Sequence, residues 1–142
     1  SAMAYLRARG LDVVLRERTK PTLGICLGMQ LMCAYSEEGD TECLGIFDVP
    51  VKKFQGPERV PHMGWNALEQ TFGTLMQGAP EQADVYFVHS YYVPVNVYTT
   101  AITEYSEPFS AALRRGPFYA TQFHPEKSAD VGARILQNFI DL

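Results

Sequence analysis

Short apolar runs separated by polar or turn residues predict alternating helices and strands in the first part of the chain. Residues 1–18 have apolar positions spaced loosely for a helix face, and Gly10 is expected to break or cap that helix. Residues 21–25 form an apolar run that is too short for a helix and suits a buried strand. Residues 27–35 then predict a helix, so a strand meets a helix at Cys26.

The rest of the chain is predicted to be rich in strands until a final helix. Residues 60–66 are apolar but are interrupted by Pro and Gly, which favours an irregular segment. Arg114–Pro117 is a predicted turn between two hairpin strands, residues 109–113 and 118–122. A stripe of apolar side chains predicts a helix over residues 128–142. Further strands are predicted over residues 49–54, 85–88 and 99–105.

Composition narrows the class of protein. No repeat, linker or low-complexity segment interrupts the 142 residues, so we expect one domain over residues 1–142. A net charge of −4 argues against nucleic acid as a partner, and no uncharged apolar run is long enough to span a membrane. The three cysteines fit neither a disulfide framework nor a zinc module, which favours a reducing compartment, and we expect the cytoplasm.

The clearest chemical pattern is Gly24-Ile25-Cys26-Leu27-Gly28, a nucleophile elbow with cysteine in place of serine. Glycines two residues before and after Cys26 are expected to remove side chains that would collide at a strained bend. The thiol would then lie above a helix N-terminus, where the helix dipole favours thiolate and the free N–H of Leu27 can bind an oxyanion. A buried cysteine in front of a core helix would give the same five residues.

His124 is the expected base for this thiol. It follows a predicted strand, at the end of the sheet where α/β sites collect. Glu126, two residues later, can accept a hydrogen bond from the imidazole N–H and set its tautomer. Each residue taken alone has an ordinary alternative, a solvated loop histidine and a carboxylate at a helix start. Together with the elbow they predict a Cys26–His124–Glu126 triad.

His62 and His89 are competing candidates for the base. Neither has a carboxylate within three residues, and we expect both to make hydrogen bonds in the core. No two histidines share a helix face or a close loop, so we expect no metal site and no cofactor. Cys33, expected on the same helix as Cys26, and Cys43, expected in a loop, are interpreted as packing thiols.

Four segments carry a resemblance to a known family. Residues 21–30, Pro-Thr-Leu-Gly-Ile-Cys-Leu-Gly-Met-Gln, and residues 123–128, Phe-His-Pro-Glu-Lys-Ser, resemble the active-site segments of class I (triad) glutamine amidotransferases. Residues 59–66 and 86–92 resemble more narrowly the glutaminase subunit or domain of imidazole glycerol phosphate synthases of histidine biosynthesis. The resemblance implies an α/β fold, a flavodoxin-like three-layer sandwich with a β-rich middle segment.

The resemblance also departs from the family at the front of the chain. Such glutaminases open with strands and a Pro-Gly-x-Gly turn that brings a second oxyanion donor, and residues 1–18 resemble the helix after that turn. The chain is therefore expected to be the C-terminal portion of a glutamine amidotransferase type-1 domain. Losing one oxyanion donor costs about 10²–10³ in rate, so we expect the chain alone to be a slow enzyme.

By resemblance, the reaction is hydrolysis of L-glutamine to glutamate and ammonia, with the ammonia channelled to a cyclase. Substrate contacts are expected at Gly28 and Gln30 beside the elbow, and at Ser90 and Tyr91. The implied partner is a (β/α)₈-barrel cyclase, separate or fused, which would use the ammonia to make imidazole glycerol phosphate. Residues 61–66 are a candidate contact with it.

Three alternatives remain open from the sequence. The first is a glutaminase of the same class that serves pyridoxal phosphate, anthranilate or nucleotide synthesis. The second is a weakly active or non-catalytic regulatory module on this fold. The third is a cysteine hydrolase of peptides or esters, which would turn over without glutamine.

Overall fold

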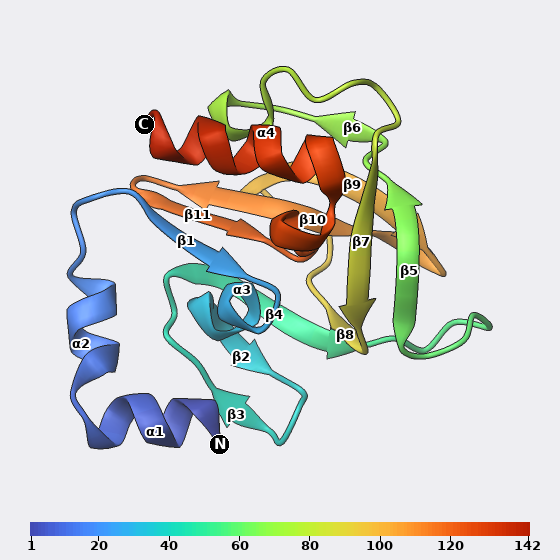
Figure 1. The fold of residues 1–142 in the computed structure, drawn as a ribbon. Helices are drawn as coiled ribbons and strands as arrows, with labels where there is room; N and C mark the ends of the chain where they lie inside the picture. The colour runs from blue at the N-terminus through green and yellow to red at the C-terminus, as the bar shows by residue number, and fades with distance from the viewer.

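The computed structural model describes residues 1–142 (Figure 1). Two short helices, α1 (Ala2–Ala8) and α2 (Leu11–Arg16), open the chain. Gly10 lies between them with a φ of 68°, which confirms the predicted break, because glycine adopts positive φ without a steric penalty. Strand β1 (Thr22–Ile25) and helix α3 (Leu27–Met32) follow, and Cys26 is the single residue between them, as predicted.

The central sheet has five strands in the order β1-β11-β10-β9-β6. Strands β10 and β11 pair antiparallel, which confirms the predicted hairpin, whereas β1 pairs parallel with β11. The parallel pairing is what positions the site, because the carboxyl ends of β1 and β11 reach the same edge of the sheet (Figure 1). The other four strands of this sheet are β6 (Gln70–Thr71), β9 (Thr99–Tyr105), β10 (Glu107–Arg115) and β11 (Phe118–Thr121).

A second sheet, in the order β3-β2-β4-β8, corrects one prediction. The helix predicted over residues 27–35 is wrong at its end, because α3 stops at Met32 and Cys33 begins strand β2. Parallel pairing of β2 with β4 and burial of Cys33 and Ser36 outweigh the helical pattern, so Cys33 does not share a helix with Cys26. The strands of this sheet are β2 (Cys33–Ser36), β3 (Thr41–Glu42), β4 (Phe47–Lys53) and β8 (Tyr91–Tyr92).

A two-stranded ribbon of β5 (His62–Ala67) and β7 (Asp84–His89) corrects a second prediction. The irregular segment expected over residues 60–66 is instead a strand, paired over six residues with β7. Pro61 lies just before the strand and removes no ladder hydrogen bond, while Gly64 takes a φ of 123° within it. The link between the two strands contains the 3₁₀ turn η1 (Thr74–Met76).

Packing on both faces of the central sheet gives the molecule its layers (Figure 1). The turn η2 (Pro125–Lys127) leads into helix α4 (Ala129–Ile140), which covers one face and contributes the fully buried Ile135. Helix α3 and the second sheet cover the other face. Neighbouring residues of β11 point to opposite sides of the sheet. Tyr119 packs in the core on the side of α4, and Ala120 packs in the core on the side of α3 and the second sheet.

These layers confirm the predicted mixed α/β fold and its strand-rich middle. The final helix is also confirmed, although its last residue, Ile140, is 72% exposed. No helix combines the length and the apolar character needed to cross a membrane.

Candidate active site

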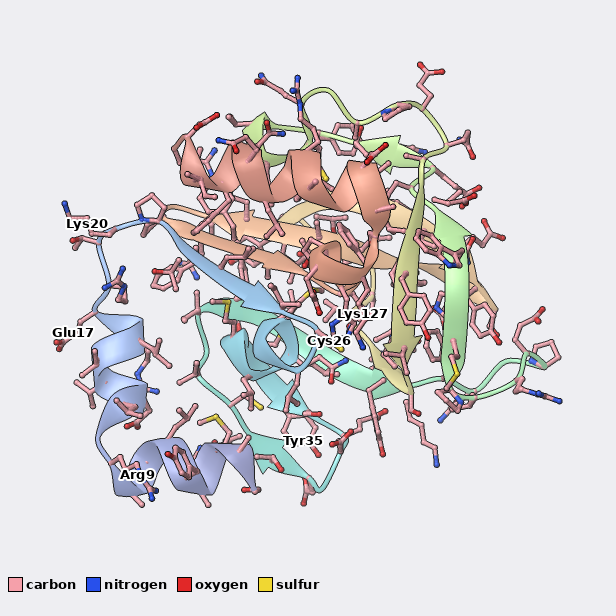
Figure 2. The ribbon with its side chains drawn as sticks, in the orientation of Figure 1. Arg9, Glu17, Lys20, Cys26, Tyr35 and Lys127 are labelled. Carbon is pink, nitrogen blue, oxygen red and sulfur yellow. The ribbon has the colours of Figure 1, made fainter.

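Cys26 lies at a strained bend between β1 and α3. Its backbone has φ 54° and ψ −105°, a combination that residues with a side chain rarely adopt. Two hydrogen bonds hold the bend: Cys26 N–H donates to the Thr121 carbonyl at 2.8 Å, and Gln30 N–H donates to the Cys26 carbonyl at 3.3 Å. The neighbouring strand and the first turn of α3 therefore fix the thiol at the carboxyl edge of the sheet (Figure 2).

The two glycines of the elbow play different parts. A Cβ added at Gly24 would lie 2.8 Å from Met32 Sδ and 2.9 Å from the backbone carbon of Gly28. A Cβ added at Gly28 would meet nothing within 4 Å. The predicted collision is confirmed for Gly24 and wrong for Gly28, because only Gly24 is enclosed between β1 and α3.

The sulfur of Cys26 contacts two groups. The thiol donates to the Val88 carbonyl at 3.6 Å, and Gln122 Nε2–H donates to Sγ at 3.7 Å. Burial raises the pKa of Cys26 above its ordinary value, while the Leu27 N–H and the Gln122 amide oppose that rise. At neutral pH the resting group is therefore a thiol, and a base must remove its proton before attack.

His124 and Glu126 form a hydrogen-bonded pair just beyond the end of β11. Nδ1 of His124 lies 2.8 Å from Glu126 Oε2. His124 N–H donates to the Tyr86 carbonyl at 3.0 Å, and Ser128 Oγ donates to the His124 carbonyl at 2.6 Å. Since the carboxylate accepts at Nδ1, the neutral ring keeps its lone pair on Nε2, which is the form that a general base needs.

The thiol and the imidazole share one end of the sheet but are not bonded to each other. Cys26 directly follows β1, and His124 follows β11, the parallel neighbour of β1. The hydrogen bonds of Sγ go to Val88 and Gln122, and His124 is not among its partners. Lys127 lies near Cys26 and lowers its pKa (Figure 2). Glu126 acts on the same sulfur and raises its pKa.

A pocket of about 180 Å³ opens at the sulfur. Its size suits a small metabolite, since pockets for drug-sized ligands are larger. Gly28 is not part of its wall and instead borders an apolar pocket beside β1. The wall of the thiol pocket is formed by Cys26, Leu27, Gln30, Glu38, Val88, His89, Ser90 and Tyr91.

Two polar residues of the site were missed by the sequence analysis. Glu38 supplies the only carboxylate of the pocket wall, from the polar turn after β2. Gln122 is fully buried and touches the sulfur. Glu38 lies in a run of ordinary surface residues and carried no signal. Gln122 stood two residues before His124 at the end of a buried strand, and a polar side chain at that place was the available clue.

His62 and His89 have the predicted hydrogen bonds in the core. Nδ1 of His62 lies 2.9 Å from Nε2 of His89, and both residues are buried. Burial lowers the pKa of His62 to about 4 and that of His89 to about 3, so both rings are neutral at pH 7. His89 lines the thiol pocket, but both of its nitrogens are engaged, Nδ1 by the Tyr91 carbonyl at 2.8 Å. Neither ring offers a free lone pair to Cys26.

The other thiols are set apart from this chemistry. Cys33 is fully buried, and burial raises the pKa of its thiol to about 12. Cys43 lies just after β3 and carries a thiol whose pKa is also raised by burial. No group of three or more His, Cys, Asp or Glu side chains is arranged to hold a metal ion.

Comparison with known proteins gives a consistent set of similarities. Residues 8–142 match the family model described as glutamine amidotransferase class-I. The chain is 54% identical to "Imidazole glycerol phosphate synthase subunit HisH" of Bacteroides thetaiotaomicron, over all of this chain and 74% of that protein. It is 49% identical to "Imidazole glycerol phosphate synthase subunit HisH 2" of Legionella pneumophila strain Paris, over all of this chain and 73% of that protein.

Solved structures share the fold at lower identity. A crystal structure of a glutamine amidotransferase superposes with a TM-score of 0.70 at 18% identity, covering 96% of this chain and 69% of that one. A glutamine amidotransferase from Thermotoga maritima superposes with a TM-score of 0.63 at 20% identity, covering 99% of this chain and 56% of that one. This chain thus spans a little over half of the Thermotoga structure and about three quarters of its curated relatives.

Proposed function

Because the chain belongs to the class I glutamine amidotransferase family, we propose that it is the glutaminase of an imidazole glycerol phosphate synthase in histidine biosynthesis. The observation that carries the proposal is the 54% identity to a HisH subunit over the whole chain. The site is consistent with it, since a cysteine at a strand–helix bend and a histidine–carboxylate pair lie at the same end of the sheet.

The first half of the proposed reaction forms a thioester. His124 Nε2 takes the proton of Cys26, and the sulfur attacks the side-chain amide carbon of glutamine. The Leu27 N–H, which lies beside the sulfur, donates to the oxyanion that develops on the amide oxygen. His124 then gives its proton to the leaving nitrogen, the C–N bond breaks, and ammonia departs. Glu126 stabilises the imidazolium that exists between the two proton transfers.

The second half releases glutamate. His124 takes a proton from water, which attacks the thioester carbon through a second oxyanion. The C–S bond breaks, and the proton on His124 returns to the sulfur. Because burial raises the pKa of the Cys26 thiol, His124 must take its proton before the sulfur can attack. Lys127 favours the thiolate electrostatically, while Glu126 opposes it.

The pocket wall offers complementary groups for an amino acid. We assign Glu38 to the α-ammonium of glutamine, since it is the only carboxylate of the wall. Ser90 and Tyr91, which were expected to bind the polar end of the substrate, line the same pocket. Gln30 also lines it, but its Nε2–H groups are engaged by the Tyr91 carbonyl and by Gln122 Oε1, both at 3.0 Å. We therefore propose that Gln30 supports the site more than it grips the substrate.

The partner follows from the chemistry of the product. Ammonia released into neutral water becomes ammonium, so a synthase must pass it directly to the acceptor site. We propose a (β/α)₈-barrel cyclase partner in the cytoplasm, as a second subunit of a heterodimer or as a fused domain. The outward face of β5 is a suitable contact, since Met63 is 62% and Trp65 54% exposed.

A pair of assays on the full protein with its cyclase tests the proposed function. We expect Cys26→Ala to abolish glutamine-dependent synthesis of imidazole glycerol phosphate, by about 10³-fold or more, and to leave synthesis from added ammonium salt unchanged. His124→Ala should behave in the same way. Equal loss of both activities would point to damage to the complex, and full retention of the glutamine-dependent activity would refute the assignment of Cys26.

A further inference from the structure

His62 and His89, two buried histidines on neighbouring strands, belong to a chain of hydrogen bonds in which every donor can be assigned. Nδ1 of His89 lies 2.8 Å from the Tyr91 carbonyl oxygen, which can only accept, so Nδ1 carries the proton. Nε2 of this neutral ring must then accept, and its partner at 2.9 Å, His62 Nδ1, donates. Nε2 of His62 accepts in turn from Asn66 Nδ2 at 3.2 Å. The three side chains therefore have one consistent arrangement of protons.

The Tyr91 carbonyl, which accepts from His89, also accepts from Gln30 and so connects the histidines with the residues around Cys26. Gln30 Nε2 donates both to the Tyr91 oxygen and to Gln122 Oε1, each at 3.0 Å. Because Gln122 Oε1 accepts from Gln30, its Nε2 is the end that faces Cys26 Sγ, at 3.7 Å. We call this set the amide–histidine row, and its members are Asn66, His62, His89, the Tyr91 carbonyl, Gln30 and Gln122.

The orientation of Gln122 matters for the sulfur. Its side chain is fully buried, so no water competes for either end of the amide. With Nε2–H toward Sγ the amide stabilises a thiolate, and it lowers the pKa of Cys26 against the effect of burial. A flipped amide would direct its oxygen at the sulfur and repel the thiolate. No buried side-chain nitrogen or oxygen in the chain lacks a partner, so a flip would leave groups unpaired.

We propose that the amide–histidine row is a positioning device that holds the Gln122 N–H against Cys26 and thereby keeps the sulfur ready to ionise. Gln122 is then a catalytic residue, since it touches the reacting atom. His89 is a positioning residue that acts through the Tyr91 carbonyl and Gln30. The inference rests on the proposed function only in naming Cys26 as the nucleophile.

Other charged groups around the row stay in place in the test. Glu126 and Lys127 act on Cys26 from η2, in opposite directions, and Glu38 lines the thiol pocket. His89 is faced by His62 and, from the end of β11, by His124. Substitutions limited to Gln122 and His89 leave all of these charges unchanged.

The experiment measures how fast iodoacetamide alkylates Cys26 in the full chain between pH 6 and pH 10, by mass spectrometry of the peptide. We expect Gln122→Met, which keeps the length but removes the donor, to alkylate about tenfold more slowly at pH 7.5. Gln122→Glu, a near-isosteric second variant that places a carboxylate beside the sulfur, should be at least as slow. His89→Phe should slow alkylation in the same direction, and His89→Asn, which can still donate, should restore part of the rate.

Two internal controls separate positioning from stability. Thr103→Val removes another buried hydrogen bond, from Oγ1 to the Ala67 carbonyl at 2.9 Å, and should leave the alkylation rate unchanged. Cys33 is fully buried and becomes labelled only when the chain opens. Slower labelling of Cys26 with Cys33 unlabelled supports the row. An unchanged pH profile in folded Gln122 and His89 variants overturns it. Alkylation needs no glutamine, so a chain that failed as a glutaminase would still give either result.

Discussion

The strained backbone at Cys26 predicts that a variant without a Cβ at this position is more stable than one that keeps it, although both lose the thiol. A residue with a Cβ at φ 54° and ψ −105° costs about 1–3 kcal/mol, and glycine avoids this cost. Glycine also loses more conformational entropy than alanine on folding, which costs about 0.5–1 kcal/mol of stability. Cys26→Gly should therefore be more stable than Cys26→Ala by about 0.5–2 kcal/mol, since both variants lack the sulfur and its contacts.

Urea unfolding and thermal melts of the two variants measure this difference. For a domain of this size about 1 kcal/mol corresponds to roughly 3 °C, so the glycine variant should melt about 2–6 °C above the alanine variant. Ala133, exposed in the interior of α4, provides the opposite control, and Ala133→Gly should cost about 1 kcal/mol. Neither Cys26 variant should hydrolyse glutamine. A glycine variant at position 26 that is less stable than the alanine variant would refute the strain.

Three further predictions concern the elbow, the buried histidines and the exposed face. Gly24→Ala should lower the free energy of unfolding in urea by about 1–3 kcal/mol, because its Cβ meets Met32 Sδ. Gly28→Ala should change the free energy of unfolding by less than about 1 kcal/mol. Equal losses of stability in the two variants would contradict the packing argument. Burial holds the pKa of His62 at about 4 and of His89 at about 3, so between pH 6.5 and pH 4 the unfolded chain binds protons that the folded chain does not. The free energy of unfolding should then fall as the pH falls through this range, by about 3 kcal/mol per histidine at pH 4, and a pH-independent urea midpoint would contradict it. Trp65→Ala should weaken cyclase binding, measured by calorimetry, because the exposed Trp65 side chain lies on the proposed contact face. Alkylation of Cys26 should keep its rate in this variant, and slower alkylation would show that Trp65 supports the active site instead.

The sequence predicts the local parts of the fold well and the long-range pairings poorly. Helix α4, the β10–β11 hairpin and the strand–helix junction at Cys26 depend on periodicity and turn residues within a few positions. The two wrong segments, residues 33–35 and 60–66, become strands because distant partners, β4 and β7, pair with them. Their local patterns, a helical face and a run broken by Pro and Gly, could not reveal partners that lie many residues away.

The candidate site divides in the same way. The elbow and the pair His124–Glu126 were predictable, because each is a short pattern with a chemical reason for its spacing. Glu38 and Gln122 were not, because their importance comes from what folds against them: Glu38 from a turn that borders the pocket, and Gln122 from the parallel pairing of β1 with β11. The thiol and the imidazole share the edge that the sequence predicted, but the hydrogen bonds of the sulfur go to Val88 and Gln122.

Covalent labelling by a glutamine-analogue electrophile tests the central claim most directly, because it asks whether the site binds glutamine and activates one thiol. We predict a single adduct on the peptide that contains Cys26, formation that free L-glutamine slows, and a large loss of rate in His124→Ala. Labelling spread over Cys33 and Cys43, or labelling of Cys26 that neither glutamine nor the loss of His124 affects, would contradict the account.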